Sequence, residues 1–345
     1  MENDYSITYH SAIGQSAWID LLRLLKEEAV SDIRGTPRLK TRAGRGYWYD
    51  QYRVASKVVD RYIGEDTEEL RERIAQHEAF RAQAKRRNSE RSRLMRILRA
   101  EGYLTADVGT GQILLAMARS GAFRLGGTLV GTQAFRMYEG VLGVQIRSDL
   151  SAQTDDIDIA SFERLSIALH DQAEPGLEDV FADLDFAPLP SVDRGQVWRW
   201  QQSDRQTLVE FLTPSFREEE GIVPLPALGV SAQSLHFLNY LIAEPIQAPA
   251  LYRAGILVQI PRPERYAIHK LIVAERRRDG TASQKARKDR IQADFLIRVL
   301  AEERPEDLSD AYRVAMEKGP AWQAAIDSSL RRLKASKDIL GNLRS

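Results

Sequence analysis

Two aspartates separated by one residue could hold a metal ion in this chain. Residues 151–162 read SAQTDDIDIASF, an apolar segment with the character of a short β-strand that acids interrupt. Because side chains alternate between the faces of a strand, Asp156 and Asp158 project from one face and Asp155 from the other. Carboxylates on one face repel each other, and a divalent cation between them removes that cost. The pattern indicates a site for Mg²⁺ or Mn²⁺, with an acidic strand end facing water as the alternative.

A third carboxylate lies in a second apolar segment. Residues 206–214 read QTLVEFLTP, in which strong strand formers surround Glu210. Val209 and Phe211 would point to the opposite face from the acid. A carboxylate among apolar residues is costly unless it binds a cation or faces a cleft. Glu210 is therefore a candidate metal ligand or proton acceptor, unless it is an edge-strand acid in solvent.

A pair of glycines upstream could bind phosphate. Residues 125–135 read LGGTLVGTQAF, and we expect Gly126 and Gly127 to form a turn that opens a helix. Free N–H groups at such a turn attract an anion, and the hydroxyl of Thr128 would add a hydrogen bond. The stretch is not a Walker A loop, because Thr132 stands where lysine is required. A tight turn without a ligand is the alternative.

The rest of the chain shows mixed helix and strand patterns. Residues 11–32 have helical periodicity, 34–46 form a basic linker punctuated by Gly and Pro, and 47–64 predict a β-hairpin. One long helix or two should follow from an N-cap at Thr67. A further helix begins at Pro263 and ends by Gly280. The tail from about residue 284 predicts three helical segments, broken near Pro305 and at Gly319-Pro320.

Composition excludes several classes of site. The 345 residues include no cysteine and only five scattered histidines, so disulfides, thiolate zinc sites and histidine-rich metal sites are excluded or disfavoured. The formal net charge is zero, so any contact with nucleic acid must come from local patches. The polar, acidic N-terminus is unlike a signal peptide, and no apolar run reaches membrane-spanning length. We therefore expect a soluble protein in the cytoplasm, without a membrane partner.

Taken in order, these motifs resemble the nucleotidyltransferase fold of the DNA polymerase β superfamily. That pattern is a Gly-Gly turn opening a helix (LGGT), an acidic strand (TDDIDIA) and a third acid on a neighbouring strand (LVEFLT). The stretch GILVQIPRPERYAIHKLIVAERR resembles the later helix of bacterial minimal nucleotidyltransferases related to abortive-infection toxins. The resemblance covers about residues 120–295. Two departures are the extra Asp155 and the glutamate at 210, where aspartate is common in the superfamily.

The resemblance implies a fold and a reaction. It implies an α+β protein with a nucleotidyltransferase-fold mixed sheet core at 106–230. An N-terminal region with helices and a hairpin (1–105) and a mainly helical, nucleotide-supporting region (231–345) would flank the core. The implied reaction moves a nucleoside monophosphate from an NTP to an acceptor hydroxyl. The implied roles are metal binding by Asp156, Asp158 and Glu210, phosphate binding by Gly126, Gly127 and Thr128, and charge compensation at the triphosphate by Lys270.

The sequence does not identify the acceptor of the nucleoside monophosphate or the partners of the protein. RNA 3′ ends, a protein hydroxyl and a small molecule all fit, and the toxin-like resemblance and local basic runs favour RNA, including tRNA. The resemblance also implies an antitoxin or another partner protein. Aromatic residues of the hairpin could stack on bases or pack the sheet; they are Tyr47, Trp48, Tyr49, Tyr52 and Tyr62. The alternatives to an enzyme are a non-catalytic nucleic-acid-binding or regulatory protein on a degenerate form of this fold, and a structural interaction protein.

Overall fold

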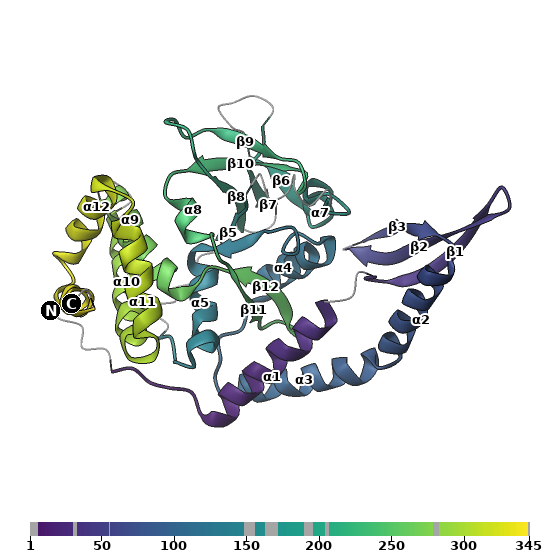
Figure 1. Cartoon of the computed structure of the whole chain (residues 1–345), viewed down its shortest axis with the longest axis horizontal. Helices are drawn as coiled ribbons and strands as arrows, with labels where there is room; N and C mark the ends of the chain where they lie inside the picture. The colour runs from purple at the N-terminus through teal and green to yellow at the C-terminus, as the bar shows by residue number, and fades with distance from the viewer. Residues whose placement is uncertain are drawn as a thin grey trace.

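The protein is an α+β molecule with one large mixed sheet and two smaller sheets (Figure 1). The computed structural model describes residues 6–29, 33–54, 56–147, 156–162, 172–189, 196–203, 207–278 and 283–343. Buried apolar residues from the first helix to the last form a main core across these ranges, and Ile33, Leu70 and Ile74 form a small separate cluster. The α+β class expected from the sequence is confirmed.

The large sheet places the acidic strand next to the strand that carries Glu210. Its strands are β4 (Thr128–Val130), β5 (Asp156–Ala160), β6 (Phe186–Pro188), β7 (Arg199–Gln202), β8 (Leu208–Pro214), β9 (Ile222–Leu225) and β10 (Val230–Leu235). The main path runs β4-β5-β8-β10-β9. β8 is parallel to β5 on one edge, while the other edge is shared by the antiparallel β7 and the parallel β10. Both predicted strands are therefore interior strands.

One face of β5 and β8 supplies the core of the sheet. Ile157, Ile159, Val209 and Phe211 are fully buried, whereas the residues between them on each strand are half-buried. Phe211 packs against Phe181 of α7 (Leu177–Asp183), with ring centroids 5.8 Å apart. Since this face is filled by apolar side chains, the alternate residues of both strands are left on the opposite face, as the sequence predicts.

The N-terminal elements differ from expectation at one segment. They are α1 (Ala12–Ala29), β1 (Thr36–Arg42), β2 (Arg45–Val54), β3 (Lys57–Glu65), α2 (Glu68–Ala82), α3 (Ala84–Ala100) and α4 (Val108–Ser120). The linker predicted at 34–46 is wrong, because β1 pairs along its whole length with β2 in a three-stranded sheet. Ala43 and Gly44 both have positive φ, as a two-residue hairpin turn requires. Pro37 is tolerated because β1 is an edge strand.

The C-terminal half is mostly helical and packs around one central helix. Its elements are α8 (Leu238–Leu241), β11 (Ile246–Ala250), β12 (Ile256–Ile260), α9 (Pro263–Arg276), α10 (Ser283–Glu303), α11 (Pro305–Met316), α12 (Pro320–Leu330) and α13 (Lys334–Asn342), while the earlier helix α5 (Gly131–Leu142) lies between β4 and β5 in the chain. α9 contacts α10, α11 and α12, and it is buried on most of its surface. The tail holds four helices instead of three, with an extra break before Lys334 that neither Pro nor Gly marks.

Helices α9 to α12 lie at one end of the molecule, and the β1–β3 sheet lies at the other (Figure 1). Within the described ranges, no helix combines the length and apolar character needed to cross a membrane.

Candidate active site

Three carboxylates face one cavity at the centre of the large sheet. Because β5 and β8 are parallel and in register, Asp158 lies directly opposite Glu210, and Asp156 lies opposite Leu208. Asp156, Asp158 and Glu210 all line a cavity of about 440 Å³. The structure thus brings together the three acids selected from the sequence. Asp155, expected on the other face, lies outside the described residues.

Electrostatic conflict between these acids fits a cation site. Burial raises the pKa of Asp158, and the charge of Asp156 raises it further. Burial and the charge of Asp158 raise the pKa of Glu210 to about 7, although Arg199 on the neighbouring strand opposes the shift. Like charges held this close, with raised pKa values, are stabilised when a divalent ion binds between them.

The protein would supply only part of a metal's coordination shell. Among the described residues, no group of three or more His, Asp or Glu side chains is close enough to enclose an ion. Mg²⁺ commonly takes one or two protein carboxylates and completes its octahedron with water and substrate phosphate oxygens. The paired carboxylates of β5 and β8 fit that mode of binding.

The glycine pair at 126–127 does not open a helix, so that expectation is wrong. Gly127 N–H donates to the carbonyl oxygen of Ala122 (2.9 Å), and the hydroxyl of Thr128 donates to the carbonyl oxygen of Gly126 (3.2 Å). Thr128 is buried and begins β4, which pairs with β5 through Ala160. These donors are already used within the turn and strand, and none of the three residues Gly126, Gly127 and Thr128 lines the cavity.

The helix that begins beside the acids is α5, three residues later. Gly131, its first residue, has a φ of +64°, and a Cβ at this position would collide with Oδ2 of Asp158. Gly131 and Thr132 both line the cavity. A helix N-terminus without a side chain next to a carboxylate pair is suited to a metal-bound phosphate. The missed signal was the apolar pair Leu129-Val130, which forms a strand directly before Gly131.

Lys270 lines the cavity but is held by an acid. Its Nζ lies 2.5 Å from Oδ1 of Asp289, and Arg277 binds the other oxygen of that carboxylate at 3.0 Å. Burial opposes the charge on Lys270, but the Asp289 carboxylate outweighs burial and holds the lysine pKa above its usual range. The ammonium is thus a fixed positive charge on the cavity wall, placed by α10 as well as by α9.

Two further lysines of α10 complete a cationic wall. Lys288 donates from Nζ to the hydroxyl of Thr132 at 3.2 Å, so it reaches the start of α5. Burial and the charge of Lys270 lower the pKa of Lys288. Lys285, one turn earlier on α10, also lines the cavity. From the sequence, the basic run at 276–290 is either a solvated face or a source of contacts to a polyanionic acceptor or to extra phosphates, because the face that α10 presents depends on its packing against α9.

The remaining wall combines aromatic, amide and imidazole groups. Trp198, Gln233, His236 and His269 line the cavity on the side of β7, β10 and α9. Burial lowers the pKa of His269 to about 3, and Lys270 lowers it further, so this imidazole is neutral at ordinary pH. This wall offers flat and hydrogen-bonding surfaces of the kind that hold a nucleobase. None of these residues was selected from the sequence.

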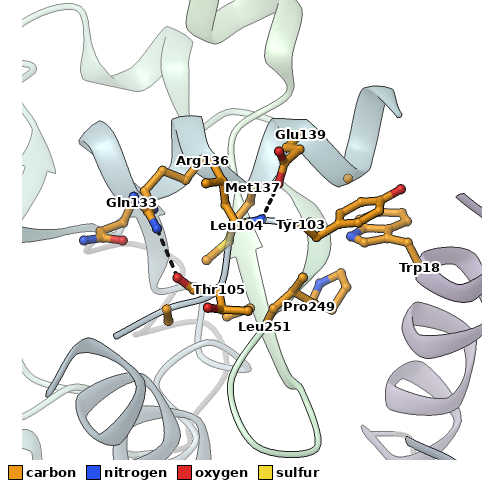
Figure 2. A pocket seen from close by; sticks show the side chains of 13 residues that line it. Trp18, Tyr103, Leu104, Thr105, Gln133, Arg136, Met137, Glu139, Pro249 and Leu251 are labelled. Carbon is orange, nitrogen blue, oxygen red and sulfur yellow. Dashed lines mark hydrogen bonds between the residues drawn. The ribbon is translucent and has the colours of Figure 1, made fainter. Parts of the chain in front are cut away.

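A second, much smaller cavity shows how α5 is anchored (Figure 2). Its volume is about 20 Å³, too small for a nucleotide. Beside it, Glu139 accepts a hydrogen bond from Leu104 N–H (2.6 Å), and Arg136 donates to the carbonyl oxygen of Thr105 (3.0 Å). These bonds tie the middle of α5 to the segment before α4, which fixes the position of the helix start at the acids.

Two family models match the chain. The model described as Nucleotidyltransferase matches residues 109–317, a span that includes the three acids, the start of α5 and both lysine-bearing helices. A model described as Domain of unknown function (DUF6788) matches residues 16–72, from α1 to the start of α2. No curated protein and no solved structure matches the chain.

Proposed function

Because the chain belongs to the nucleotidyltransferase family and is a transferase enzyme, we propose that it moves a nucleoside monophosphate from an NTP to an acceptor hydroxyl. The observation that carries this proposal is the pairing of Asp158 with Glu210, beside Asp156, at a cavity of about 440 Å³. Lysines 270, 285 and 288 of α9 and α10 line the same cavity. Acids for a metal and cations for phosphates within one cavity are the arrangement that phosphoryl-type transfer requires.

Asp156 and Asp158 would hold one or two Mg²⁺ or Mn²⁺ ions, and Glu210 would complete the set. When bound, the ion supplies positive charge that offsets the developing charge on the phosphate oxygens. The support for this assignment is the chemistry of the donor set: three hard carboxylates, the raised pKa values of Asp158 and Glu210, and no competing cysteine ligand.

The phosphates would lie between the start of α5 and the lysines of α10. Gly131 admits a phosphate to the helix N-terminus, where backbone N–H groups bind it. The side chain of Lys288, already at Thr132, would bind the β- or γ-phosphate, and Lys270 would add charge next to the leaving group. This assignment moves the phosphate site from the glycine pair at 126–127 to Gly131 and Thr132.

The reaction is a single displacement at the α-phosphorus. The acceptor oxygen forms a bond to that phosphorus while the bond from the phosphorus to the bridging β-oxygen breaks, and pyrophosphate leaves. Glu210, with a pKa raised to about 7, is suited to take the proton of the acceptor hydroxyl, because a base works best with a pKa near the working pH. As a metal ligand it would instead lower the barrier through the ion it helps to bind.

More specifically, we propose that the chain has the nucleotidyltransferase fold of the DNA polymerase β superfamily. We also propose that it has a toxin-like or defence-related role and that RNA is its acceptor. The support for this fold is the order of the motifs along the chain: glycine-hydroxyl turn, acidic strand, third acid and lysine helix. The cationic wall of α10 supports a polyanionic acceptor. A cytoplasmic location, an antitoxin partner and the region boundaries near residues 105 and 230 stay predictions.

A label-transfer experiment identifies both substrates. The full chain is incubated with each α-labelled NTP, Mg²⁺ and a cell lysate, and the products are then digested with nuclease or protease. Label that nuclease releases from wild type, and that is absent with the Asp158→Asn variant, supports transfer to RNA. Label released only by protease overturns RNA as the acceptor, and failure of every NTP to label any product overturns nucleotidyl transfer.

A further inference from the structure

One face of the β1–β3 sheet carries tyrosines among cations. Cross-strand pairing sets Arg38 opposite Tyr49 and Lys40 opposite Tyr47, and it sets Tyr49 opposite Tyr62 on the other side. The rings lie together, with centroids 5.6 Å apart for Tyr49 and Tyr62, and Lys40 sits 4.7 Å above the Tyr49 ring. We name this surface the tyrosine face and define it by Arg38, Lys40, Arg42, Tyr47, Tyr49 and Tyr62.

The opposite face of the same sheet does the packing. Tyr52, Val54 and Val59 are buried there, and Trp48 packs with Ile33 and residues of α2. The five aromatic residues of the predicted hairpin therefore separate into two groups. Trp48 and Tyr52 serve the core, while the three tyrosines of the tyrosine face do not, and Tyr62 keeps 55% of its surface exposed. Packing against the core therefore does not explain why Tyr47, Tyr49 and Tyr62 lie together on this face.

Positive charge accompanies the rings. Arg38 and Arg42 are exposed and form no ion pair with a described residue, while Lys40 shares the Asp60 carboxylate at 2.7 Å. Asp60 and Glu65 lie on the same sheet and offset part of this charge, and the exposed Arg38 and Arg42 supply the cations of the face that pair with no described residue. The hairpin of β1 and β2, which carries these cations, projects from the molecule (Figure 1). Flat rings spaced along a sheet with guanidinium groups around them match the two parts of single-stranded nucleic acid, its bases and its phosphates.

We propose that the tyrosine face binds single-stranded RNA. Bases stack on Tyr47, Tyr49 and Tyr62, and the backbone phosphates contact Arg38 and Arg42. The face lies at the end of the molecule opposite α9 and α10 (Figure 1), so it holds the RNA at a distance from the reacting hydroxyl. The choice of RNA over DNA, and the link to catalysis, rest on the proposed function. The binding of a single strand to the tyrosine face rests only on the residues of that face.

Binding is measured on the full chain carrying Asp158→Asn, so that no turnover occurs. Fluorescence anisotropy with a mixed-sequence single-stranded RNA should give an affinity that falls about tenfold or more in Tyr49→Ala/Tyr62→Ala, since each stacked base contributes strongly. Tyr62→Phe should keep the wild-type affinity, because the ring is retained. Phe216→Ala, which removes an exposed aromatic residue elsewhere, should leave the affinity unchanged. Arg38→Ala/Arg42→Ala should weaken binding and reduce its salt dependence.

Three results would overturn the proposal. They are RNA affinity unchanged in the folded double tyrosine variant, equal binding of duplex and single strand, and self-association through this face without RNA binding. Circular dichroism confirms the fold of each variant. Tyr62→Phe keeps the ring and removes only the hydroxyl, so it shows whether the ring itself is what binds RNA. NTP binding, measured by calorimetry on the same proteins, should not change. RNA affinity that the tyrosine substitutions leave unchanged, with intact NTP transfer to a short acceptor, refutes only the tyrosine face, whereas RNA binding without transfer by the wild type refutes only the proposed function.

Discussion

Asp158 of β5 lies directly opposite Glu210 of β8, so two carboxylates meet on the same face of two interior parallel strands. Each raises the electrostatic cost of ionising the other, and burial adds to that cost. A protein that keeps like charges together inside its central sheet loses stability unless a ligand offsets them. The pair is therefore better explained by what binds there than by the fold.

The first prediction concerns stability at this pair. Asp158→Asn should unfold at a higher temperature than wild type at about pH 8 without metal, because a charge whose ionised form is disfavoured in the folded state is removed. The same variant should lose nucleotidyl transfer. Asp155→Asn is the matched control and should change transfer much less. A clear loss of stability in Asp158→Asn would show that the pair is structural.

The second prediction separates two glycines. Gly131→Ala should abolish transfer and weaken NTP binding, because a Cβ there meets the Asp158 carboxylate and the φ of +64° disfavours any side chain. Gly127→Ala should mainly lower the melting temperature, because its Cβ would lie 2.8 Å from the Ala122 carbonyl oxygen, away from the cavity. Calorimetric NTP titration and thermal unfolding of both variants test this. Weaker NTP binding by a stably folded Gly127→Ala would return the phosphate site to the first glycine pair.

The third prediction concerns Lys288. Lys288→Ala should reduce NTP affinity by about 1 to 3 kcal/mol, the range for losing a hydrogen bond to a charged group. Arg287→Ala, one residue earlier on α10, removes an exposed cation that does not line the cavity and should have little effect. Equal affinities of the two variants, measured by calorimetry with the same NTP, would argue against a phosphate contact at Lys288.

The fourth prediction is a dependence of stability on pH. His269 has its pKa lowered by burial from about 6.5 to about 3, so the unfolded chain binds a proton that the folded chain rejects. The stability that neutral His269 contributes is fully present when the pH is above the unfolded-state pKa of this residue. It is lost as the pH falls toward the folded-state pKa. Between about pH 7.5 and about pH 5, wild type should lose roughly 2 kcal/mol more unfolding free energy than His269→Gln. Denaturant titrations at both pH values test this, and parallel losses in the two proteins would contradict it.

Local patterns predicted the strands that carry the three acids and the face on which the acids lie. Strand periodicity alone places Asp156 and Asp158 on one face and Glu210 among strand formers, and both strands form as expected. Helix α9 likewise begins at the proline that marked it. In these segments short-range preference and long-range packing favour the same conformation, so the local pattern was sufficient.

Other parts of the site depend on contacts distant in sequence. The helix α5 begins at Gly131 because residues 128–130 pair with β5, a partner more than 25 residues away, which no local pattern reveals. The face that α10 presents to the cavity is set by its packing on α9, so the basic run allowed phosphate contacts but did not show that Lys285 and Lys288 line the cavity. The segment at 34–46 looked like a linker because the Gly and Pro that suit a hairpin edge also suit a loop.

Nucleotidyl transfer at the acids of β5 and β8 is tested most directly by comparing the fates of the α- and the γ-phosphate of the NTP. Purified wild-type protein and Asp158→Asn are incubated with an accepted NTP carrying either an α- or a γ-phosphate label, an acceptor identified in the lysate experiment, and Mg²⁺ or a chelator. We predict that wild type transfers only the α-label and releases the γ-label in pyrophosphate. The chelator or Asp158→Asn should abolish both events. Transfer of the γ-label, or α-label transfer that persists in Asp158→Asn, would contradict nucleotidyl transfer at the acids of β5 and β8.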